Sequence, residues 1–309
     1  MGINELGRPA RVACIGECMV ELRELPDGSL RRSHGGDTLN TAVYLARLGV
    51  AVDYVTALGD DAWSDEMLSR WRAEGIGTEL VHRLHGRLPG LYIIQTDPAG
   101  ERRFFYWRDS AAAKSLFDHL DPAALGAFDV LYLSGITLSI YDPPARETLL
   151  AALERARERG AWVVFDTNYR PRGWPDPEVA RELYARLFAC STIVLASTED
   201  LALLYGADGE ERLLRHAINT EIVLKLDQPG SRIQVGSEVT SVRAEAVARV
   251  VDTTAAGDSF ASAYLAQRLL GATPERAAAA GHRLAGMVVG YPGALMPLAA
   301  MPNFEDPEE

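Results

Sequence analysis

The sequence has little cysteine, with only three in 309 residues, Cys14, Cys18 and Cys190. A small, odd number of cysteines excludes a disulfide framework and suits a protein of the reducing cytoplasm, where we expect this one to reside. Cys14 and Cys18 have three residues between them, but no second pair of ligands follows, which disfavours a metal site there. We expect Cys14 to pack in a buried strand.

Long apolar runs and an excess of positive charge are also missing. No segment reaches the ~18 consecutive apolar residues of a membrane span, and residues 1–11 contain no apolar signal-peptide core. The formal net charge of −12 disfavours anionic partners such as nucleic acid or an acidic membrane surface. An anionic substrate would therefore have to be bound by local basic residues.

Two glycine fingerprints of nucleotide-binding proteins are absent. The sequence contains neither G-x-G-x-x-G nor G-x-x-x-x-G-K-[ST]. The first motif binds a dinucleotide and the second forms a P-loop that binds phosphates. Without them, the sequence gives little support for a dinucleotide-binding protein or a P-loop protein. A dinucleotide-dependent dehydrogenase is then suggested only by the α/β pattern described next.

What the sequence does contain is an alternation of apolar strands and amphipathic helices. Strands are predicted at 12–16, 52–58, 130–133, 162–166, 193–196 and 221–226. Helices are predicted at 39–48, 62–74, 143–159, 178–189, 259–270 and 274–289. Such alternation indicates a mostly parallel sheet with helices on both faces, and 309 residues can form one large domain. We expect functional residues at the carboxyl ends of the strands, including Asp258 after an apolar Val250-Val251 pair.

Two segments, about 17–34 and 80–108, interrupt that alternation with short strands and turns. In the second, residues 92–96 and 103–107 flank Pro98-Ala99-Gly100 as the arms of a hairpin would. These segments predict a small sheet that projects from the main domain and acts as a lid. The aromatic residues at 104–107 fit either packing within the hairpin or burial between subunits.

Residues 251–260, Val-Asp-Thr-Thr-Ala-Ala-Gly-Asp-Ser-Phe, combine small residues with a carboxylate where a loop becomes a helix. The free N–H groups of a first helical turn, with the positive end of the helix dipole, bind anions such as phosphate. Asp258 beside such a site would serve as the base of a phosphoryl transfer. By itself, the run fits a simple helix cap equally well.

Residues 35–42, Gly-Gly-Asp-Thr-Leu-Asn-Thr-Ala, form a second notable run. Paired glycines before a helix allow a ligand to approach the backbone closely. Asp37 and Asn40 then offer an acceptor and a donor about one turn apart, which suits sugar hydroxyls. Alternatively, Asp37 is only the N-cap of that helix.

Together the runs 35–42 and 252–258 resemble the two signatures of the PfkB/ribokinase family of carbohydrate kinases. The resemblance covers residues 11–301. It implies an α/β fold of the ribokinase-like three-layer α/β/α type, with a mostly parallel central sheet and a small β-sheet lid. It also implies one kinase domain over residues 1–309 and a homo-oligomer formed through the lid sheet. The negative net charge predicts no nucleic-acid or membrane partner.

Within that family the chain is most similar to the kinases of the sugar acid 2-keto-3-deoxy-D-gluconate. The resemblance implies that Arg170, in the run 165–172, binds the substrate carboxylate together with Arg108. A guanidinium pairs with a carboxylate through two parallel hydrogen bonds, which a neutral sugar would not need. Both arginines could also be ordinary surface charges. The other implied substrate residues are Gly35, Gly36, Asp37, Asn40, Tyr92, Tyr106 and Ile136.

For ATP, the resemblance implies a site between the last strands and the last helices. The implied nucleotide residues are Asn168, Ser197, Lys225, Gly230, Gly257 and His282. Lys225 and His282 also fit a surface lysine and a helix-surface histidine. Mg²⁺ would arrive with ATP, held through phosphates, waters and one or two carboxylates, for which Asp200 is a candidate. A monovalent cation is also compatible with the family.

The chain departs from the family pattern at three places. Ala255 replaces a common glycine, and we expect the anion site to survive if φ at Ala255 stays negative. Ser197 replaces an amide in the N-x-x-E run, and Lys225-Leu226-Asp227 replaces K-x-G. The first two departures affect the phosphate and metal assignments, and the third affects the shape of the loop after Lys225.

The predicted activity is the ATP-dependent phosphorylation of the terminal hydroxyl of 2-keto-3-deoxy-D-gluconate. Asp258 would be the general base, and the backbone N–H groups of Ala255, Ala256 and Gly257 would stabilise the transferring group. The alternatives are a kinase for another sugar or sugar acid, such as fructose or 5-keto-2-deoxygluconate, and a catalytically silent sugar-binding protein on the same scaffold.

Overall fold

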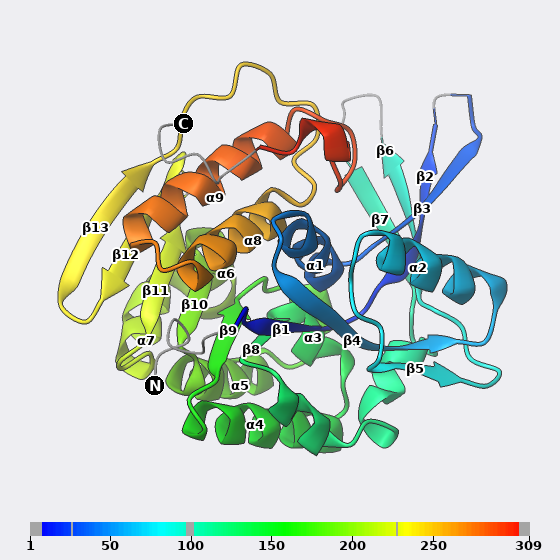
Figure 1. Ribbon diagram of the computed structural model, residues 1–309, viewed down its shortest axis with the longest axis horizontal. Helices are drawn as coiled ribbons and strands as arrows, with labels where there is room; N and C mark the ends of the chain where they lie inside the picture. Colours follow the sequence, from blue (N-terminus) through cyan, green and yellow to red (C-terminus); the bar gives the residue numbers. More distant parts are fainter. Residues whose placement is uncertain (1–7, 26, 97–101, 227, 303–309) are drawn as a thin grey trace.

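The computed structural model describes residues 8–25, 27–96, 102–226 and 228–302, whose strands form two separate sheets (Figure 1). The strands are β1 (Arg11–Ile15), β2 (Met19–Glu24), β3 (Leu30–Gly35), β4 (Ala51–Gly59), β5 (Val81–Leu84), β6 (Leu91–Thr96), β7 (Arg102–Trp107), β8 (Val130–Ser134), β9 (Trp162–Asp166), β10 (Ile193–Ser197), β11 (Glu221–Lys225), β12 (Gly230–Val235) and β13 (Glu238–Arg243). The helices are α1 (Asp37–Arg47), α2 (Ala62–Ala73), α3 (Gly135–Ile140), α4 (Pro143–Glu158), α5 (Pro177–Cys190), α6 (Thr198–Tyr205), α7 (Gly209–His216), α8 (Ala256–Leu269) and α9 (Pro274–Val288), with a short 3-10 helix η4 (Pro171–Gly173) before α5.

The larger sheet has nine strands in the order β13-β12-β11-β10-β9-β8-β1-β4-β5. Neighbouring strands from β11 through β5 are parallel, and β12 and β13 run antiparallel at one edge. The prediction of a mostly parallel central sheet is therefore confirmed.

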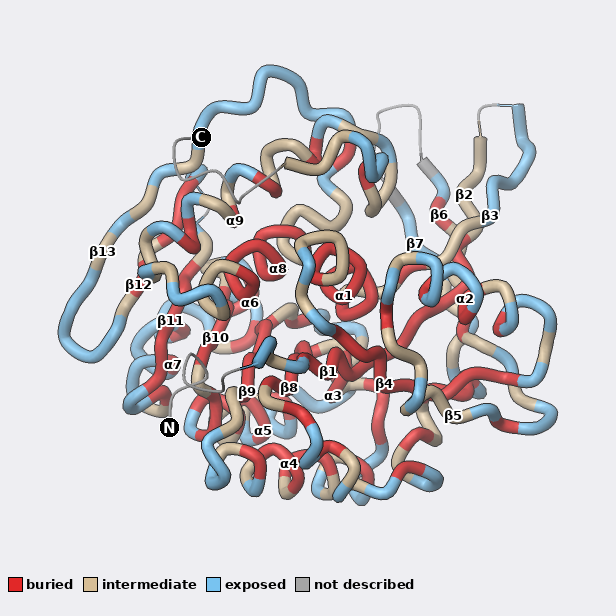
Figure 2. The backbone as a smooth tube through the Cα atoms, viewed as in Figure 1, coloured by how far each residue is buried: buried red, intermediate tan, exposed pale blue. Residues whose placement is uncertain are grey.

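Helices cover both faces of this sheet because its strands are apolar on both sides. In β1, Ala13 and Ile15 pack into the core beside α4, α5 and α7, whereas Val12 and Cys14 pack into the core beside α1, α8 and α9. Figure 2 shows the strands from β11 to β4 in the sheet order as a buried layer between helices whose outer sides are exposed, whereas β13 at the edge is largely exposed. Cys14 is fully buried in this strand, as predicted.

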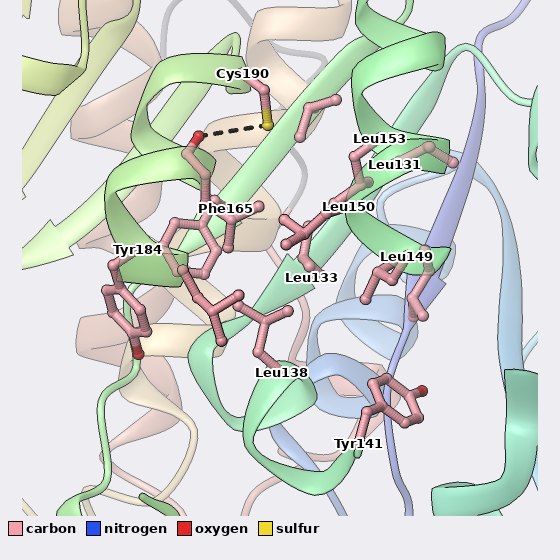
Figure 3. Close-up of a cluster of buried hydrophobic side chains, with 14 of the residues drawn as sticks. Leu131, Leu133, Leu138, Tyr141, Leu149, Leu150, Leu153, Phe165, Tyr184 and Cys190 are labelled. Atoms are coloured by element: carbon pink, nitrogen blue, oxygen red, sulfur yellow. Dashed lines mark hydrogen bonds between the residues drawn. The ribbon is translucent and has the colours of Figure 1, made fainter. Parts of the chain in front are cut away.

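Figure 3 shows the first of these cores. Leu149, Leu150 and Leu153 of α4 recur at helical spacing and are fully buried against the sheet. Phe165 of β9 meets Tyr184 of α5 edge to face, with ring centroids 5.0 Å apart. Each buried leucine stabilises the fold by about 1.5–3 kcal/mol, so this face holds β8 and β9 firmly in place.

The second sheet has four strands in the order β3-β2-β6-β7 and stands beside α2 at one end of the molecule (Figure 1). Both predicted insertions contribute to it, β2 and β3 from the first and β6 and β7 from the second. The second insertion begins with β5, however, which extends the large sheet beside β4. The β6–β7 hairpin pairing is confirmed, and its turn at Pro98-Ala99-Gly100 lies outside the described residues.

Several short elements escaped the sequence patterns. Helices α3 and α6 start directly after β8 and β10, where Ser134 and Ser197 cap them through their hydroxyl groups. Such short helices have too few turns to show a clear period. The Val250-Val251 pair forms no strand, contrary to the prediction; the Val251 N–H instead donates to Val289 O at 2.8 Å. No helix in the described part of the chain is long and apolar enough to cross a membrane.

Candidate active site

The loop before α8 presents backbone N–H groups at the N-terminus of a 14-residue helix. Within the described ranges, the N–H groups of Ala255, Gly257 and Asp258 have no backbone acceptor, whereas that of Ala256 donates to Thr253 O at 3.3 Å. Unpaired N–H groups and the positive end of the helix dipole attract an anion. This loop is therefore suited to a phosphoryl group.

Ala255 turns the chain into α8 in the left-handed conformation, with φ 62° and ψ 16°. The condition stated from the sequence, a negative φ at this position, is therefore not met. A side chain in this region costs about 1–2 kcal/mol, because Cβ approaches the carbonyl oxygen. A left-handed residue followed by helical ones lets successive N–H groups converge on an anion. The alanine thus follows the backbone path that a glycine would take.

Asp258 lies in the first turn of α8, facing α1. Asn40 of α1 donates from Nδ2 to Asp258 Oδ2 at 2.8 Å. Burial of the carboxylate and the nearby charge of Asp37 raise the pKa of Asp258 to about 8, and donation from Asn40 opposes this rise only in part. A carboxylate with a pKa near neutral is a far better proton acceptor than an ordinary one.

Two further polar pairs adjoin Asp258. Asn168, expected on the nucleotide side, donates from Nδ2 to Asp37 Oδ2 at 2.6 Å and so reaches the expected sugar side. Lys225 Nζ donates to Asp166 Oδ2 at 3.2 Å. A methyl group built on Gly257 would lie 3.7 Å from Lys225 Nζ, so the ammonium group lies close to the N-terminus of α8.

The other residues expected to bind the nucleotide lie on or beside three neighbouring strands of the large sheet, β10, β11 and β12. In the strand register, Lys225 is paired with Ser197 of β10 on one side and with Ser231 of β12 on the other. Ser231 Oγ lies 2.9 Å from Nε2 of His282 on α9, and Gly230 precedes Ser231 with φ 150°. Burial lowers the pKa of His282, which favours the neutral ring.

The small sheet turns a polar face toward the 35–42 run. Its register places Glu21, Tyr92 and Tyr106 side by side, and Tyr92 Oη donates to Glu21 Oε2 at 2.5 Å. A methyl group on Gly35 would lie 3.1 Å from Tyr92 Oη, and one on Gly36 would lie 2.1 Å from the carbonyl oxygen of Glu17. The paired glycines therefore allow the chain entering α1 to pass close to Tyr92 and to the segment between β1 and β2.

Arg108 follows β7 and is ion-paired with Glu17, whose side chain is only 1% exposed. The guanidinium groups of Arg108 and Arg172 lie 6.0 and 5.1 Å from the ring centroid of Tyr106. Burial raises the pKa of Tyr106, while Arg108, Arg172 and Arg170 act to lower it. Two arginines therefore lie over the ring of Tyr106, and the charge of a third also acts to lower its pKa.

Arg170 lies at the edge of this group, with its side chain 59% exposed. Its Nη1 donates to Asp200 Oδ1 at 3.2 Å, and Thr167 Oγ1 donates to Asp200 Oδ2 at 2.7 Å. Among the described residues, no hydrogen bond or ion pair joins Arg170 to Arg108. What they share is an effect on Tyr106, whose pKa the charges of both arginines act to lower.

Ile136 is half-buried in α3, with its carbonyl oxygen accepting from Ser139 Oγ at 2.8 Å. A methyl group on Gly173 would lie 2.8 Å from the same Ser139 Oγ. Helix α3 thus lies against η4, the segment that follows Arg170 and includes Arg172.

Three charged residues of this site were not singled out from the sequence: Glu17, Asp166 and Arg172. Asp166 is the last residue of β9, so the strand-end rule already pointed to it. Glu17 is fully buried two residues after β1, and a buried carboxylate carries no sequence signal of its own. The guanidinium of Arg172 lies over the ring of Tyr106. These residues are distant in the chain, so the sequence does not show their contact.

Within the described ranges, no group of three or more His, Cys, Asp or Glu side chains is arranged to hold a metal ion. Asp200, the sequence candidate, is buried and accepts from Thr167 and Arg170. A metal ion at this site would therefore depend on ligands from a bound substrate, as a magnesium–phosphate complex does.

Comparison with known proteins supports the resemblance seen in the sequence. The chain is 43% identical over 306 residues to the 2-dehydro-3-deoxygluconokinase of Escherichia coli (strain K12), across 94% of this chain and 99% of the relative. It is 38% identical over 309 residues to the 2-dehydro-3-deoxygluconokinase of Haemophilus influenzae, across 96% and 98% of the two chains.

The fold also matches that of a solved sugar kinase. Aminoimidazole riboside kinase from Salmonella enterica, complexed with aminoimidazole riboside and an ATP analog, superposes with a TM-score of 0.79 at 26% identity, covering 93% of this chain and 96% of that one. The model of the family described as "pfkB family carbohydrate kinase" matches residues 9–300. The chain therefore belongs to the pfkB family of carbohydrate kinases.

Proposed function

We propose that this sugar kinase transfers a phosphoryl group from ATP to the terminal hydroxyl of 2-keto-3-deoxy-D-gluconate, also named 2-dehydro-3-deoxy-D-gluconate. The observation that carries the proposal is the position of Asp258, whose pKa is raised, in the first turn of α8 beside unpaired N–H groups and Lys225. The two relatives described above, at 43% and 38% identity, are 2-dehydro-3-deoxygluconokinases, which supports the choice of acceptor.

Asp258 acts as the general base in this scheme. Its carboxylate takes the proton of the terminal hydroxyl as that oxygen bonds to the γ-phosphorus of ATP, while the bond from the γ-phosphorus to the bridging oxygen breaks and ADP leaves. The hydrogen bond from Asn40 fixes the orientation of the carboxylate, so that one oxygen stays directed at the hydroxyl. Asp37, which receives a hydrogen bond from Asn168, binds the sugar beside it.

The N-terminus of α8 and Lys225 stabilise the negative charge of the phosphoryl group. The N–H groups of Ala255 and Gly257 are unpaired, whereas that of Ala256 already donates to Thr253 O, so Ala256 contributes least. Donors fixed in advance lower the barrier because they need no reorganisation during the reaction. Mg²⁺ bound to ATP supplies further neutralisation of phosphate charge.

The substrate carboxylate is bound on the lid side, by Arg108 and Arg170. In the structure each guanidinium is held by a protein carboxylate, Glu17 for Arg108 and Asp200 for Arg170. These pairs fix the direction of each guanidinium and leave other N–H groups for the sugar acid. Closure of the small sheet over the sugar would exclude water and limit the hydrolysis of ATP.

A sugar-panel assay tests the proposal. ADP release is measured by a coupled assay with Mg-ATP and 2-keto-3-deoxy-D-gluconate, 5-keto-2-deoxygluconate, gluconate, fructose or ribose. We expect the highest kcat/KM with 2-keto-3-deoxy-D-gluconate. A higher value with fructose or 5-keto-2-deoxygluconate would reassign the acceptor. Sugar binding by calorimetry without any turnover would instead indicate a silent binding protein.

The same assay tests whether the enzyme requires a monovalent cation. Replacing sodium and potassium with tetramethylammonium salts shows whether a monovalent cation is required, as the family resemblance allows. A loss of activity that potassium restores would add that cation to the cofactors ATP and Mg²⁺.

We also propose a homo-oligomer formed through the lid sheet. The register places Phe105 and Trp107 on the face opposite Tyr92 and Tyr106, and they are 44% and 59% exposed. Exposed aromatic residues on one sheet face favour pairing with a second copy. Sedimentation of the Phe105→Ser, Trp107→Ser double variant should give a smaller species than the unaltered protein, and equal masses would reject this interface.

A further inference from the structure

A chain of polar contacts crosses the small sheet and reaches Asp252, in the loop that leads into α8 and Asp258. The sheet register places Glu21 beside Tyr92, and Arg23 of β2 two residues farther along the same face. This polar face contains the expected sugar-binding residue Tyr92. The chain therefore begins at the sugar side of the site.

The first links of the chain lie within the small sheet. Tyr92 Oη and Ser33 Oγ donate to the two oxygens of Glu21, at 2.5 and 3.0 Å. Arg23 Nη2 lies 3.7 Å from Glu21 Oε1, which is within the range of an ion pair. Glu21 thus connects the tyrosine to Arg23.

The next link leaves the small sheet. Arg23 Nη1 donates to Asp252 Oδ2 at 3.0 Å, across 229 positions of the chain. The side chains of Arg23 and Asp252 are 22% and 2% exposed, so water screens this ion pair weakly. Among the described residues, it is the ion pair that joins the small sheet to the loop before α8.

Asp252 in turn holds that loop together. Its Oδ1 accepts from the N–H and the hydroxyl of Thr254, at 2.9 and 2.5 Å, and its Oδ2 accepts from the N–H of Gly293 at 2.9 Å. Burial opposes the charge of Asp252, but these donors and Arg23 outweigh it and lower its pKa. The carboxylate therefore stays ionised and fixes the start of the run that ends at Asp258.

We propose that Arg23 is a positioning residue that couples sugar binding at the small sheet to phosphate binding at the N-terminus of α8. The proposal rests on the proposed function of that site. A sugar that orders Tyr92 and Glu21 also fixes Arg23, and Arg23 fixes Asp252 and the unpaired N–H groups that follow it. Binding of the sugar and of the nucleotide should then strengthen each other by the same factor.

The test uses Arg23→Gln with Arg31→Gln as the matched control. Arg31 lies directly opposite Arg23 on β3, carries the same charge and is exposed. Calorimetry gives the Kd of Mg²⁺ with a non-hydrolysable ATP analogue, in the presence and absence of 2-keto-3-deoxy-D-gluconate. The ratio of the two Kd values is the coupling factor.

We expect a coupling factor of about 5- to 150-fold in the unaltered protein and in Arg31→Gln, and a factor near one in Arg23→Gln. Arg23→Lys, which keeps the charge, should restore most of the coupling. Equal coupling in Arg23→Gln and Arg31→Gln would overturn the proposal, as would an unaltered protein that binds both ligands without coupling.

A second readout does not depend on the identity of the sugar. In the ligand-free protein, hydrogen exchange of the amides at 252–258 should be at least about tenfold faster in Arg23→Gln than in Arg31→Gln. If the sugar panel reassigns the acceptor, this difference still supports the link from the small sheet to the loop. Unchanged exchange would reject the link, whatever the sugar. If Arg23→Gln does not fold, Arg23→Met, which also removes the charge and leaves the contacts of Asp252 with Thr254 and Gly293 in place, is used in both measurements.

Discussion

Asp252 and Asp258 lie at the two ends of one seven-residue run that leads from a loop into α8, yet their surroundings shift their pKa values in opposite directions. Asp252 accepts from Thr254, Gly293 and Arg23, and its pKa is lowered. The carboxylate of Asp258 accepts only from Asn40 among the described side chains, and burial with the charge of Asp37 raises its pKa. Several donors stabilise the charged form of Asp252, which is typical of a structural carboxylate. Asp258 has few donors and is buried, which is typical of a carboxylate that acts as a base.

Replacing the base should have the largest effect. Asp258→Asn keeps the contact with Asn40 but cannot take a proton, so kcat for sugar phosphorylation should fall by ~10²–10⁴-fold. Steady-state assays with Mg-ATP measure this change. A kcat within a factor of three of the unaltered protein would remove Asp258 from its role.

The same variant should gain stability. The folded-state pKa of Asp258 lies above its ordinary value, so ionising this carboxylate destabilises the fold progressively as the pH rises between about 4 and 8. Asp258→Asn should therefore have a higher urea midpoint than the unaltered protein at pH 8, and the difference should shrink at pH 4. A lower midpoint at pH 8 would show that the carboxylate is stabilising.

Replacing the structural carboxylate should mainly affect stability. Asp252→Asn removes the charged partner of Arg23 and weakens the acceptor for Thr254 and Gly293, which should cost about 3 kcal/mol of unfolding free energy. Asp118→Asn is the control, because Asp118 is exposed and forms no ion pair among the described residues. Equal urea midpoints for the two variants would contradict the structural role of Asp252.

The lid arginines should affect substrate affinity more than turnover. Arg170→Ala should raise KM for the sugar acid by about 10- to 100-fold, since it loses a charge-assisted hydrogen bond to a carboxylate. KM for ATP is the internal control and should change by less than threefold. Equal increases in both KM values would place Arg170 away from the substrate carboxylate.

The smallest effect is expected at Ala255. Ala255→Gly relieves the left-handed backbone but adds freedom to the unfolded chain, so stability should change by no more than about 1 kcal/mol, with kcat unaltered. Ala255→Val, with a branched side chain at the same φ, should be clearly less stable than either. A stable Ala255→Val variant would mean that φ is not positive there in solution.

The sequence predicted the central sheet well because long apolar strands and periodic helices carry clear local signals. Strand β9 was predicted with its observed bounds, 162–166. The strand order, the position of β5 and the short helices after Ser134 and Ser197 depend on contacts between distant segments or on too few residues for a period. These features therefore needed the structure.

For the site, the sequence supplied the residues but not their partners. Asn40 and Asn168 were both expected to bind ligands, yet the structure shows each donating to a carboxylate, Asp258 and Asp37. Glu17 and Arg23 were not singled out, because their partners Arg108 and Asp252 are 91 and 229 positions away. The positive φ of Ala255 was missed because alanine rarely adopts it.

The pH dependence of kcat/KM most directly tests the assignment of Asp258 as the base and of Asp252 as a structural carboxylate. It is measured from pH 5 to 9.5 at limiting sugar acid and ATP, for the unaltered protein and for Asp252→Asn. Since only the ionised base accepts a proton, we expect kcat/KM to rise about tenfold per pH unit and to level off near pH 8, with the same bend in both proteins. A profile that is already level from pH 5 upward would contradict the account.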